Sequence, residues 1–107
     1  MKDEPVLATT TTPTVETAEA IAGRLVEERL AACVQIAEPI TSVYRWRGKV
    51  EKAKEILLLI KSTRQRVQEI ARLLERMHPY EVPELVAVPI VDGSASYLEW
   101  LGENCRP

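Results

Sequence analysis

Three ionisable side chains stand where this sequence could carry out chemistry. His78, the only histidine, precedes a Pro-Tyr pair and could bind a metal ion or transfer a proton near neutral pH. From the residues alone, a histidine that ends a helix and bonds the nearby backbone explains it better. Glu84 follows a proline directly before an apolar strand, and Lys61 ends the apolar run 56–60. An ion pair between these two across a subunit boundary is at least as good an explanation as ligand binding.

Aromatic residues make up only 5% of the chain. Tyr44 and Trp46 flank a predicted turn, and Tyr80 follows the second predicted helix. Because the rings are so few, we expect them to fill the core or an interface rather than stack on a ligand. We predict that Lys61, Tyr80 and Glu84 gather in a ligand-binding or interface cleft near a subunit boundary. Trp46 is expected at the edge of that cleft.

Periodic patterns predict the elements that position these side chains. Runs of apolar and β-branched residues predict strands, and apolar residues at helical spacing predict helices. Thr14 is a predicted helix cap, and the spacing of Ser62 and Gln65 resembles a capping box. Gly48 favours a tight turn after Arg47. The predicted strands cover 6–12, 31–36, 40–46, 50–62 and 85–91, and the predicted helices cover 15–30, 67–77 and a short segment around 97–101.

With 31–46 counted as one strand that Pro39 bends or interrupts, the element order is β-α-β-β-α-β followed by a short helix. That order predicts a ferredoxin-like α+β sandwich, in which two helices cover one face of an antiparallel sheet. The runs 56–60 and 85–91 are nevertheless apolar on both faces, whereas a half-exposed strand alternates. Another copy of the chain is the simplest cover for the second face. The length of 107 residues predicts one domain, 1–107.

Composition disfavours several classes of partner. The chain has 14 basic and 16 acidic side chains, a net charge of -2, which disfavours sequence-independent binding to nucleic acid. The longest purely apolar run, 85–91, is far shorter than a membrane span. Two cysteines cannot form the disulfide framework of a small secreted domain, so we expect a reducing, cytoplasmic location. Cys33 is expected in the core, and Cys105 is expected to be incidental in a tail.

Five strings of residues together resemble the CutA divalent-cation tolerance proteins over nearly the whole chain. The resemblance implies a ferredoxin-like fold, a tight homotrimer joined through its sheets, a cytoplasmic protein and a link to the response to metal ions. Members of that family also resemble the PII signalling trimers in architecture. The strings are Leu30-Ala-Ala-Cys-Val34, Thr41-Ser-Val-Tyr-Arg-Trp-Arg-Gly-Lys49, Leu59-Ile-Lys-Ser-Thr63, His78-Pro-Tyr-Glu-Val-Pro-Glu84 and Tyr97-Leu-Glu-Trp-Leu101.

Copper-binding members of the family share a cysteine late in the first strand, two adjacent histidines before Pro-Tyr, and a glutamate after a proline. Here Thr10 stands at the cysteine position and Met77 at the first histidine, which leaves only His78 and Glu84. Two protein ligands are fewer than the three or four that zinc or copper normally takes. We therefore expect at most weak binding of a divalent metal such as copper, and no required cofactor.

The sequence thus predicts a homotrimer that binds, senses or acts as a scaffold in the response to divalent metal ions, without catalysis. The alternative is a small-molecule enzyme, or a PII-like ligand-binding signalling protein, with sites between subunits. Two other classes lack their required residues, one of them an RNA-recognition module that shares the element order. An RNA-recognition module needs aromatic residues on its central strands. An acylphosphatase-like hydrolase needs a glycine-rich, anion-binding loop after the first strand.

Overall fold

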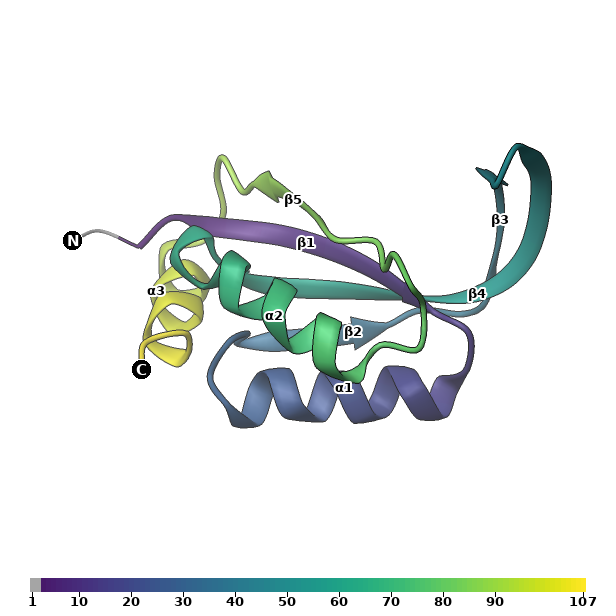
Figure 1. The fold of residues 1–107 in the computed structure, drawn as a ribbon. Coiled ribbons are helices and arrows are strands. Elements are labelled where there is room, and N and C mark those ends of the chain that lie inside the picture. The colour runs from purple at the N-terminus through teal and green to yellow at the C-terminus, as the bar shows by residue number, and fades with distance from the viewer. Residues whose placement is uncertain (1–2) are drawn as a thin grey trace.

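Five strands and three α-helices form an α+β fold over residues 3–107, the part of the chain that this computed structural model describes (Figure 1). The order of elements matches the prediction. No helix in that range is both long and apolar enough to cross a membrane. The strands are β1 (Pro5–Thr12), β2 (Cys33–Ile36), β3 (Ile40–Trp46), β4 (Lys49–Thr63) and β5 (Val86–Pro89). The helices are α1 (Val15–Glu27), α2 (Val67–Met77) and α3 (Ala95–Asn104), with a 3-10 turn at Arg64–Arg66.

The sheet has the ferredoxin-like topology that the sequence predicted. Its strand order is β2-β4-β1-β5, with β3 paired to β4, and every neighbouring pair is antiparallel. Two β-α-β units therefore interleave, because α1 joins β1 to β2 across β4 and α2 joins β4 to β5 across β1. The second half of β4 pairs with β1, whereas its first half pairs with β3. This β3–β4 hairpin, residues 40–55, curves away from the rest of the sheet in Figure 1 and is called the hairpin arm below.

Helices α1 and α2 lie on the same face of the sheet (Figure 1). Alternate residues of β1 and β4 point toward them, which gives the two strands their alternating burial. Thr14 caps α1 as predicted, because its side chain accepts a hydrogen bond from the Thr17 N–H at 3.1 Å. The core between sheet and helices contains Ala8, Leu58 and Ile60 from the strands, Ala18, Ile21 and Leu25 from α1, and Ile70, Leu73 and Leu74 from α2.

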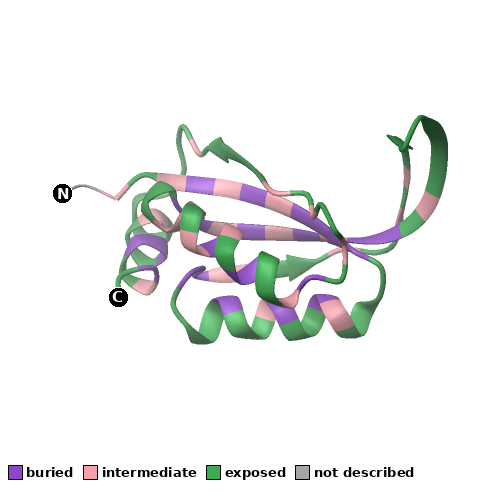
Figure 2. Ribbon diagram, viewed as in Figure 1, coloured by how far each residue is buried: buried purple, intermediate pink, exposed green. Residues whose placement is uncertain are grey.

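The opposite face of the sheet is largely uncovered. The register sets Val86 beside Thr9 and Val88 beside Leu7, so these side chains share the face turned away from α1 and α2. Val86 is 57% exposed and Val88 is 54% exposed. Figure 2 shows the same exposure along β5 and along most of the hairpin arm. The predicted strand 85–91 is observed over Val86–Pro89. Its Val86 and Val88 form an apolar face that no element within residues 3–107 covers.

The end of α1 comes three residues earlier than predicted. Arg29 adopts a left-handed backbone conformation with φ of 60°. The Arg29 N–H donates to the Val26 carbonyl at 3.1 Å, and the Leu30 N–H donates to the Leu25 carbonyl at 2.9 Å. These two bonds form a Schellman motif, which usually has glycine at the left-handed position. Because arginine occupies this position in place of glycine, the sequence pattern did not indicate the helix end.

Three predictions about single residues are wrong. Ser62 does not cap the next helix, because its side chain points into the core and donates to the Leu30 carbonyl at 2.5 Å. Cys105 is not incidental, since it is 2% exposed and packs with Ala32 and Leu101. Its thiol lies 3.9 Å from Ser62 Oγ, and burial raises the pKa of that thiol. Cys33, expected in the core, is only half-buried on β2.

Candidate functional site

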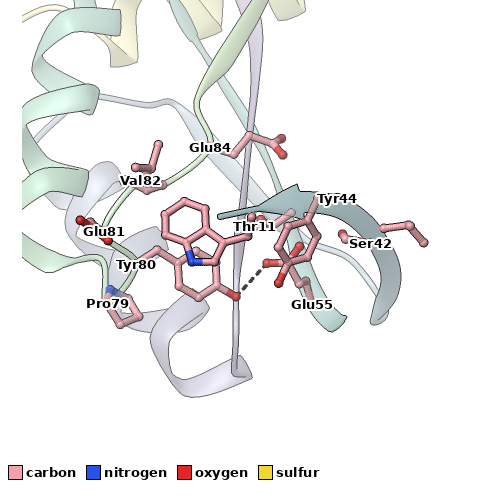
Figure 3. A pocket seen from close by; sticks show the side chains of 12 residues that line it. Thr11, Ser42, Tyr44, Glu55, Pro79, Tyr80, Glu81, Val82 and Glu84 are labelled. Atoms are coloured by element: carbon pink, nitrogen blue, oxygen red, sulfur yellow. Dashed lines mark hydrogen bonds between the residues drawn. The ribbon is translucent and has the colours of Figure 1, made fainter. Parts of the chain in front are cut away.

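A cleft of about 710 Å³ opens between the hairpin arm and the loop 78–85, which joins α2 to β5 (Figure 3). The arm contributes aromatic, aliphatic and acidic side chains, and the loop contributes a tyrosine, two prolines and two glutamates. A volume of this size suits a small organic molecule. The lining residues are Thr11, Ser42, Val43, Tyr44, Trp46, Glu55, Pro79, Tyr80, Glu81, Val82, Pro83 and Glu84.

His78 fixes the start of the loop against β1. Its backbone is extended, with φ of -79° and ψ of 136°, as expected for the residue before a proline. Nδ1 accepts the Tyr80 N–H at 3.1 Å, so Nε2 carries the ring proton and donates to the Thr11 carbonyl at 2.7 Å. The ring is 8% exposed and both of its nitrogens are bonded. His78 therefore bridges β1 and the loop and positions Tyr80.

Tyr80 joins the loop to the hairpin arm. Its hydroxyl donates to Glu55 Oε2 at 2.8 Å, the bond drawn as a dashed line in Figure 3. Burial, followed by the hydrogen bond to Glu55 and the charge of that carboxylate, raises the pKa of Tyr80 to about 12. The hydroxyl consequently remains a protonated donor at neutral pH and does not serve as a base or nucleophile. Glu55 is 7% exposed and forms no ion pair with any residue in the range 3–107.

Trp46 lies at the far end of the arm, next to the turn. The turn uses positive φ at both Arg47 (51°) and Gly48 (81°), as predicted for a two-residue hairpin turn. The Arg47 guanidinium lies 5.5 Å from the centroid of the Trp46 ring. Its Nη2 also pairs with Glu81 Oε2 at 3.0 Å, a second contact between arm and loop. Both partners are exposed, so this ion pair contributes little to stability.

Glu84 lies at the end of the loop, directly before β5. One of its carboxylate oxygens accepts a hydrogen bond from Thr9 Oγ1 at 3.1 Å. Thr9 belongs to the uncovered face of the sheet, so Glu84 lies on that face as well. The carboxylate forms no ion pair among the described residues.

The structure brings together three of the four residues predicted to share a cleft. Trp46, Tyr80 and Glu84 all line it. Lys61 does not, because β4 carries it to the other end of the uncovered face, between Leu7 and Cys33. Its Nζ lies 5.7 Å from the ring centroid of Tyr97 in α3.

Sequence reasoning missed Glu55 and gave Tyr44 no role in a site. The segment 49–55 alternates polar and small apolar residues, which predicts a half-exposed strand and hides the buried position of its last residue. One signal was available, since Glu55 directly precedes the apolar run 56–60. The start of a buried apolar run is an unusual position for a carboxylate.

The side chains expected to bind a metal do not form a tight centre. No group of three His, Cys, Asp or Glu side chains within residues 3–107 could hold an ion. His78 would have to break one of its two hydrogen bonds to become a ligand. Thr10 is fully buried with an unbonded hydroxyl, on the face covered by the helices, whereas Glu84 lies on the other face. The donor set therefore does not fit copper or zinc without rearrangement.

Comparison with known proteins agrees with the sequence resemblance. The family model described as CutA1 divalent ion tolerance protein matches residues 6–104. The divalent-cation tolerance protein CutA of Thermus thermophilus is 50% identical over 94 residues, which cover 88% of this chain and 91% of that protein. A CutA homolog from Xenopus laevis is 43% identical over 93 residues, 87% of this chain. The chain matches only 62% of the length of that animal relative.

A solved structure gives the same assignment. The structure of the divalent cation tolerance protein from Thermus thermophilus superposes with a TM-score of 0.91 and 47% sequence identity. The match covers 94% of this chain and 97% of the solved one. The sequence, the ferredoxin-like sheet and the solved structure thus agree, and this chain belongs to the CutA1 divalent ion tolerance family.

Proposed function

We propose that this chain acts in tolerance to divalent metal ions as a homotrimeric binding, sensing or scaffold protein. The observation that carries the proposal is an uncovered apolar surface beside the cleft. Val86 and Val88 of β5 are more than half exposed on this surface. Val43 and Val50 of the hairpin arm are also more than half exposed, on the other face of the β3–β4 ladder. An apolar surface of this kind on a small domain is typical of an interaction site.

A second copy of the chain is the partner that suits this surface. Strand β5 is an edge of the sheet, and β3 pairs only with β4, so both strands leave backbone N–H and C=O groups free on one side. Pairing of such edges between copies would cover the valines and satisfy those groups together. The number of three copies follows from the resemblance to the CutA family. Lys61, which lies on the same face, would then be enclosed near a subunit boundary.

Light scattering tests the assembly directly. We expect a mass about three times the 12.0 kDa of the chain. Val88→Lys should reduce that mass, because a charged side chain would replace an apolar one in the contact. Val26→Lys is a matched control, since Val26 is a 44% exposed valine on α1, away from this surface. A wild-type monomer, or a trimer that Val88→Lys leaves intact, would contradict the proposal.

The cleft favours a second candidate, a PII-like ligand-binding signalling protein. Its polar groups are arranged for binding rather than catalysis, because Tyr80 is a protonated donor and His78 has no free nitrogen. A thermal-shift screen against metal ions, nucleotides and common metabolites would separate the candidates. Stabilisation by a small molecule, lost in Tyr44→Ser, would favour the signalling protein. Conversion of that molecule to a product would instead indicate an enzyme.

We also propose a cytoplasmic location. Cys33 and Cys105 are both free thiols, and free thiols persist in a reducing compartment. Localisation of a tagged full-length protein in fractionated cells tests this. Recovery in an oxidising compartment would contradict it.

A further inference from the structure

Glu55 is a buried carboxylate without a counter-charge. It is 7% exposed, and its hydrogen-bond donor, Tyr80, is a neutral hydroxyl. Three other carboxylates, those of Glu28, Glu69 and Glu81, each pair with an arginine. Buried carboxylates in proteins are normally paired with a cation, because an unpaired charge is costly to remove from water. Within residues 3–107 nothing supplies that cation to Glu55.

The cleft contains a second carboxylate without a cation. Glu84 is held by the Thr9 hydroxyl at 3.1 Å, again a neutral donor. Glu84 and Glu55 both line the cleft, Glu84 from the loop and Glu55 from the hairpin arm (Figure 3). The raised pKa of Tyr80 is partly due to the charge on Glu55. Of the three glutamates that line the cleft, Glu81 pairs with Arg47, whereas Glu55 and Glu84 have no cation partner among the described residues.

Aromatic rings form much of the remaining wall. Three of the five aromatic residues of the chain, Tyr44, Trp46 and Tyr80, line this one cleft. In the single chain, Tyr44 is 43% exposed and Trp46 is 39% exposed. The faces of such rings attract cations. The Trp46 ring already does so, because the Arg47 guanidinium lies 5.5 Å from its centroid.

The combination favours an organic cation over a metal ion. A bare divalent ion needs several oxygen, nitrogen or sulfur ligands, and no group of three acidic, histidine or cysteine side chains lies together in the described chain. Aromatic faces with one or two carboxylates are instead the pattern that holds alkylated ammonium groups. The volume of about 710 Å³ is also far larger than a metal ion needs.

We propose that this cleft binds a small organic ammonium ion, with Glu55 and Glu84 supplying negative charge and the rings of Tyr44, Trp46 and Tyr80 supplying cation–π contacts. This inference rests on the ligand-binding role proposed above for the cleft. It adds the chemical class of the ligand: a protonated alkylamine or a quaternary ammonium compound. An ammonium group could come from a free molecule or from a lysine of a second copy, and we propose the free molecule.

Calorimetry with a charged and an uncharged probe of the same shape tests the proposal. Choline is the charged probe, and 3,3-dimethylbutan-1-ol is the neutral one. We expect saturable binding of choline at least about tenfold tighter than binding of the neutral alcohol. Equal affinity for the two probes, or no binding of choline to any form of the protein, would overturn the proposal.

Variants identify the groups responsible. Glu55→Gln removes the charge and keeps an acceptor for Tyr80, and we expect it to weaken choline binding about tenfold or more. Tyr44→Ser, at a half-exposed position that should tolerate the change, is expected to weaken it about threefold or more. Glu19→Gln is the control, because Glu19 is an exposed carboxylate on α1. Choline affinity that neither Glu55→Gln nor Tyr44→Ser changes would contradict the assignment.

A last variant separates the two sources of the ammonium group. If Lys61 of another copy already fills the cleft, choline will bind Lys61→Met but not the wild type, which would overturn binding of a free ligand. Equal binding to both supports the proposal. Light scattering on the same samples measures the oligomeric state independently of choline binding. A trimer that does not bind choline refutes this inference alone, whereas a monomer refutes the proposed assembly.

Discussion

At the scale of single residues, the cleft depends on a short chain of hydrogen bonds. The Thr11 carbonyl accepts from His78, His78 accepts from the Tyr80 backbone, and the Tyr80 hydroxyl donates to Glu55. These bonds tie the loop 78–85 to β1 at one end and to the hairpin arm at the other. Removing one member therefore leaves a polar group of its neighbour without a partner.

Tyr80→Phe should lower the stability of the protein. The substitution keeps the ring and removes the donor, which leaves the Glu55 carboxylate buried without its hydrogen bond. A buried group left unsatisfied costs about 1–3 kcal/mol. Urea denaturation measures the loss. Tyr97→Phe, at a 39% exposed tyrosine of α3, is the control and should change stability by less than about 0.5 kcal/mol. Equal effects of the two substitutions would argue against the Tyr80–Glu55 bond.

The same bond predicts how stability depends on alkaline pH. The folded protein raises the pKa of Tyr80 from 10.0 to about 12, so the unfolded chain releases this proton at a lower pH than the folded chain does. The contribution of Tyr80 is therefore complete below pH 10 and is lost as the pH rises toward 12. Denaturation at pH 8 to 12 should show a steeper loss of stability for the wild type than for Tyr80→Phe. Parallel curves would contradict the assignment.

His78 should matter more to folding than to metal binding. His78→Ala removes both of its buried hydrogen bonds, and we expect it to lower the free energy of unfolding, measured by urea denaturation, by about 2–3 kcal/mol.

Calorimetric titration of the wild type with copper or zinc should give an affinity weaker than about micromolar, because His78 and Glu84 offer an incomplete ligand shell. Tight stoichiometric binding that His78→Ala abolishes would mean that the ring exchanges its hydrogen bonds for a metal.

At the scale of elements, α3 is held in place by a residue from the end of α1. The Arg29 side chain donates to the carbonyls of Glu103 at 2.5 Å and Arg106 at 2.6 Å. Glu103 is in the last turn of α3, and Arg106 follows the helix. The position of α3 in turn keeps Cys105 2% exposed. A turn residue thus contacts both sides of a buried thiol more than seventy positions later in the chain.

Arg29→Ala should make Cys105 reactive. In a Cys33→Ser background, the wild-type thiol is expected to react slowly with a chromogenic disulfide reagent, because burial hides it and raises its pKa. Loss of the Arg29 bonds should loosen α3 and speed the reaction about tenfold or more. Arg24→Ala, which breaks an exposed ion pair on α1, is the control and should leave the rate unchanged. No difference between the two variants would rule out this role for Arg29.

The elements that the sequence predicts well are those whose signal is local. Thr14 caps α1, and Ala18, Ile21 and Leu25 form its buried stripe, because cap chemistry and helical period need no distant partner. Ser62 has the spacing of a capping box, yet tertiary contact with Leu30 turns its side chain inward. Cys105 is buried because the end of α3 packs against Ala32, a contact between distant parts of the chain that no local pattern indicates.

In the candidate site, too, the sequence predicts only those relations that are local along the chain. Tyr80 and Glu84 could be placed together because one short loop carries both of them. Lys61 could not be placed from strand order alone, because its distance from Glu84 depends on where along β4 the chain pairs with β1. Glu55 was missed because the alternating pattern of its segment resembles that of a solvent-exposed strand. The partner of Glu55, Tyr80, lies 25 positions later in the loop, so the segment 49–55 carries no local sign of this contact.

At the scale of the whole molecule, the shape of one chain is unusually extended for its length. The radius of gyration is 14.3 Å and the extents are 44 × 25 × 23 Å, whereas about 13 Å is typical of a compact chain of 107 residues. Figure 1 shows the hairpin arm projecting beyond the layers of sheet and helices. The arm packs against little of its own chain, so contacts with other copies are the means by which it could gain stability.

Stability should therefore depend on protein concentration. If unfolding is coupled to dissociation of a trimer, mass action raises the midpoint of thermal unfolding as the concentration rises. Calorimetric scans of the wild type from about 1 to 100 μM should show a steady upward shift in this midpoint. Val88→Lys should unfold at a lower temperature with a smaller shift, because it weakens association through the uncovered face. Val26→Lys should follow the wild type. A wild-type midpoint that is independent of concentration would show that the hairpin arm and β5 are stable within a single chain.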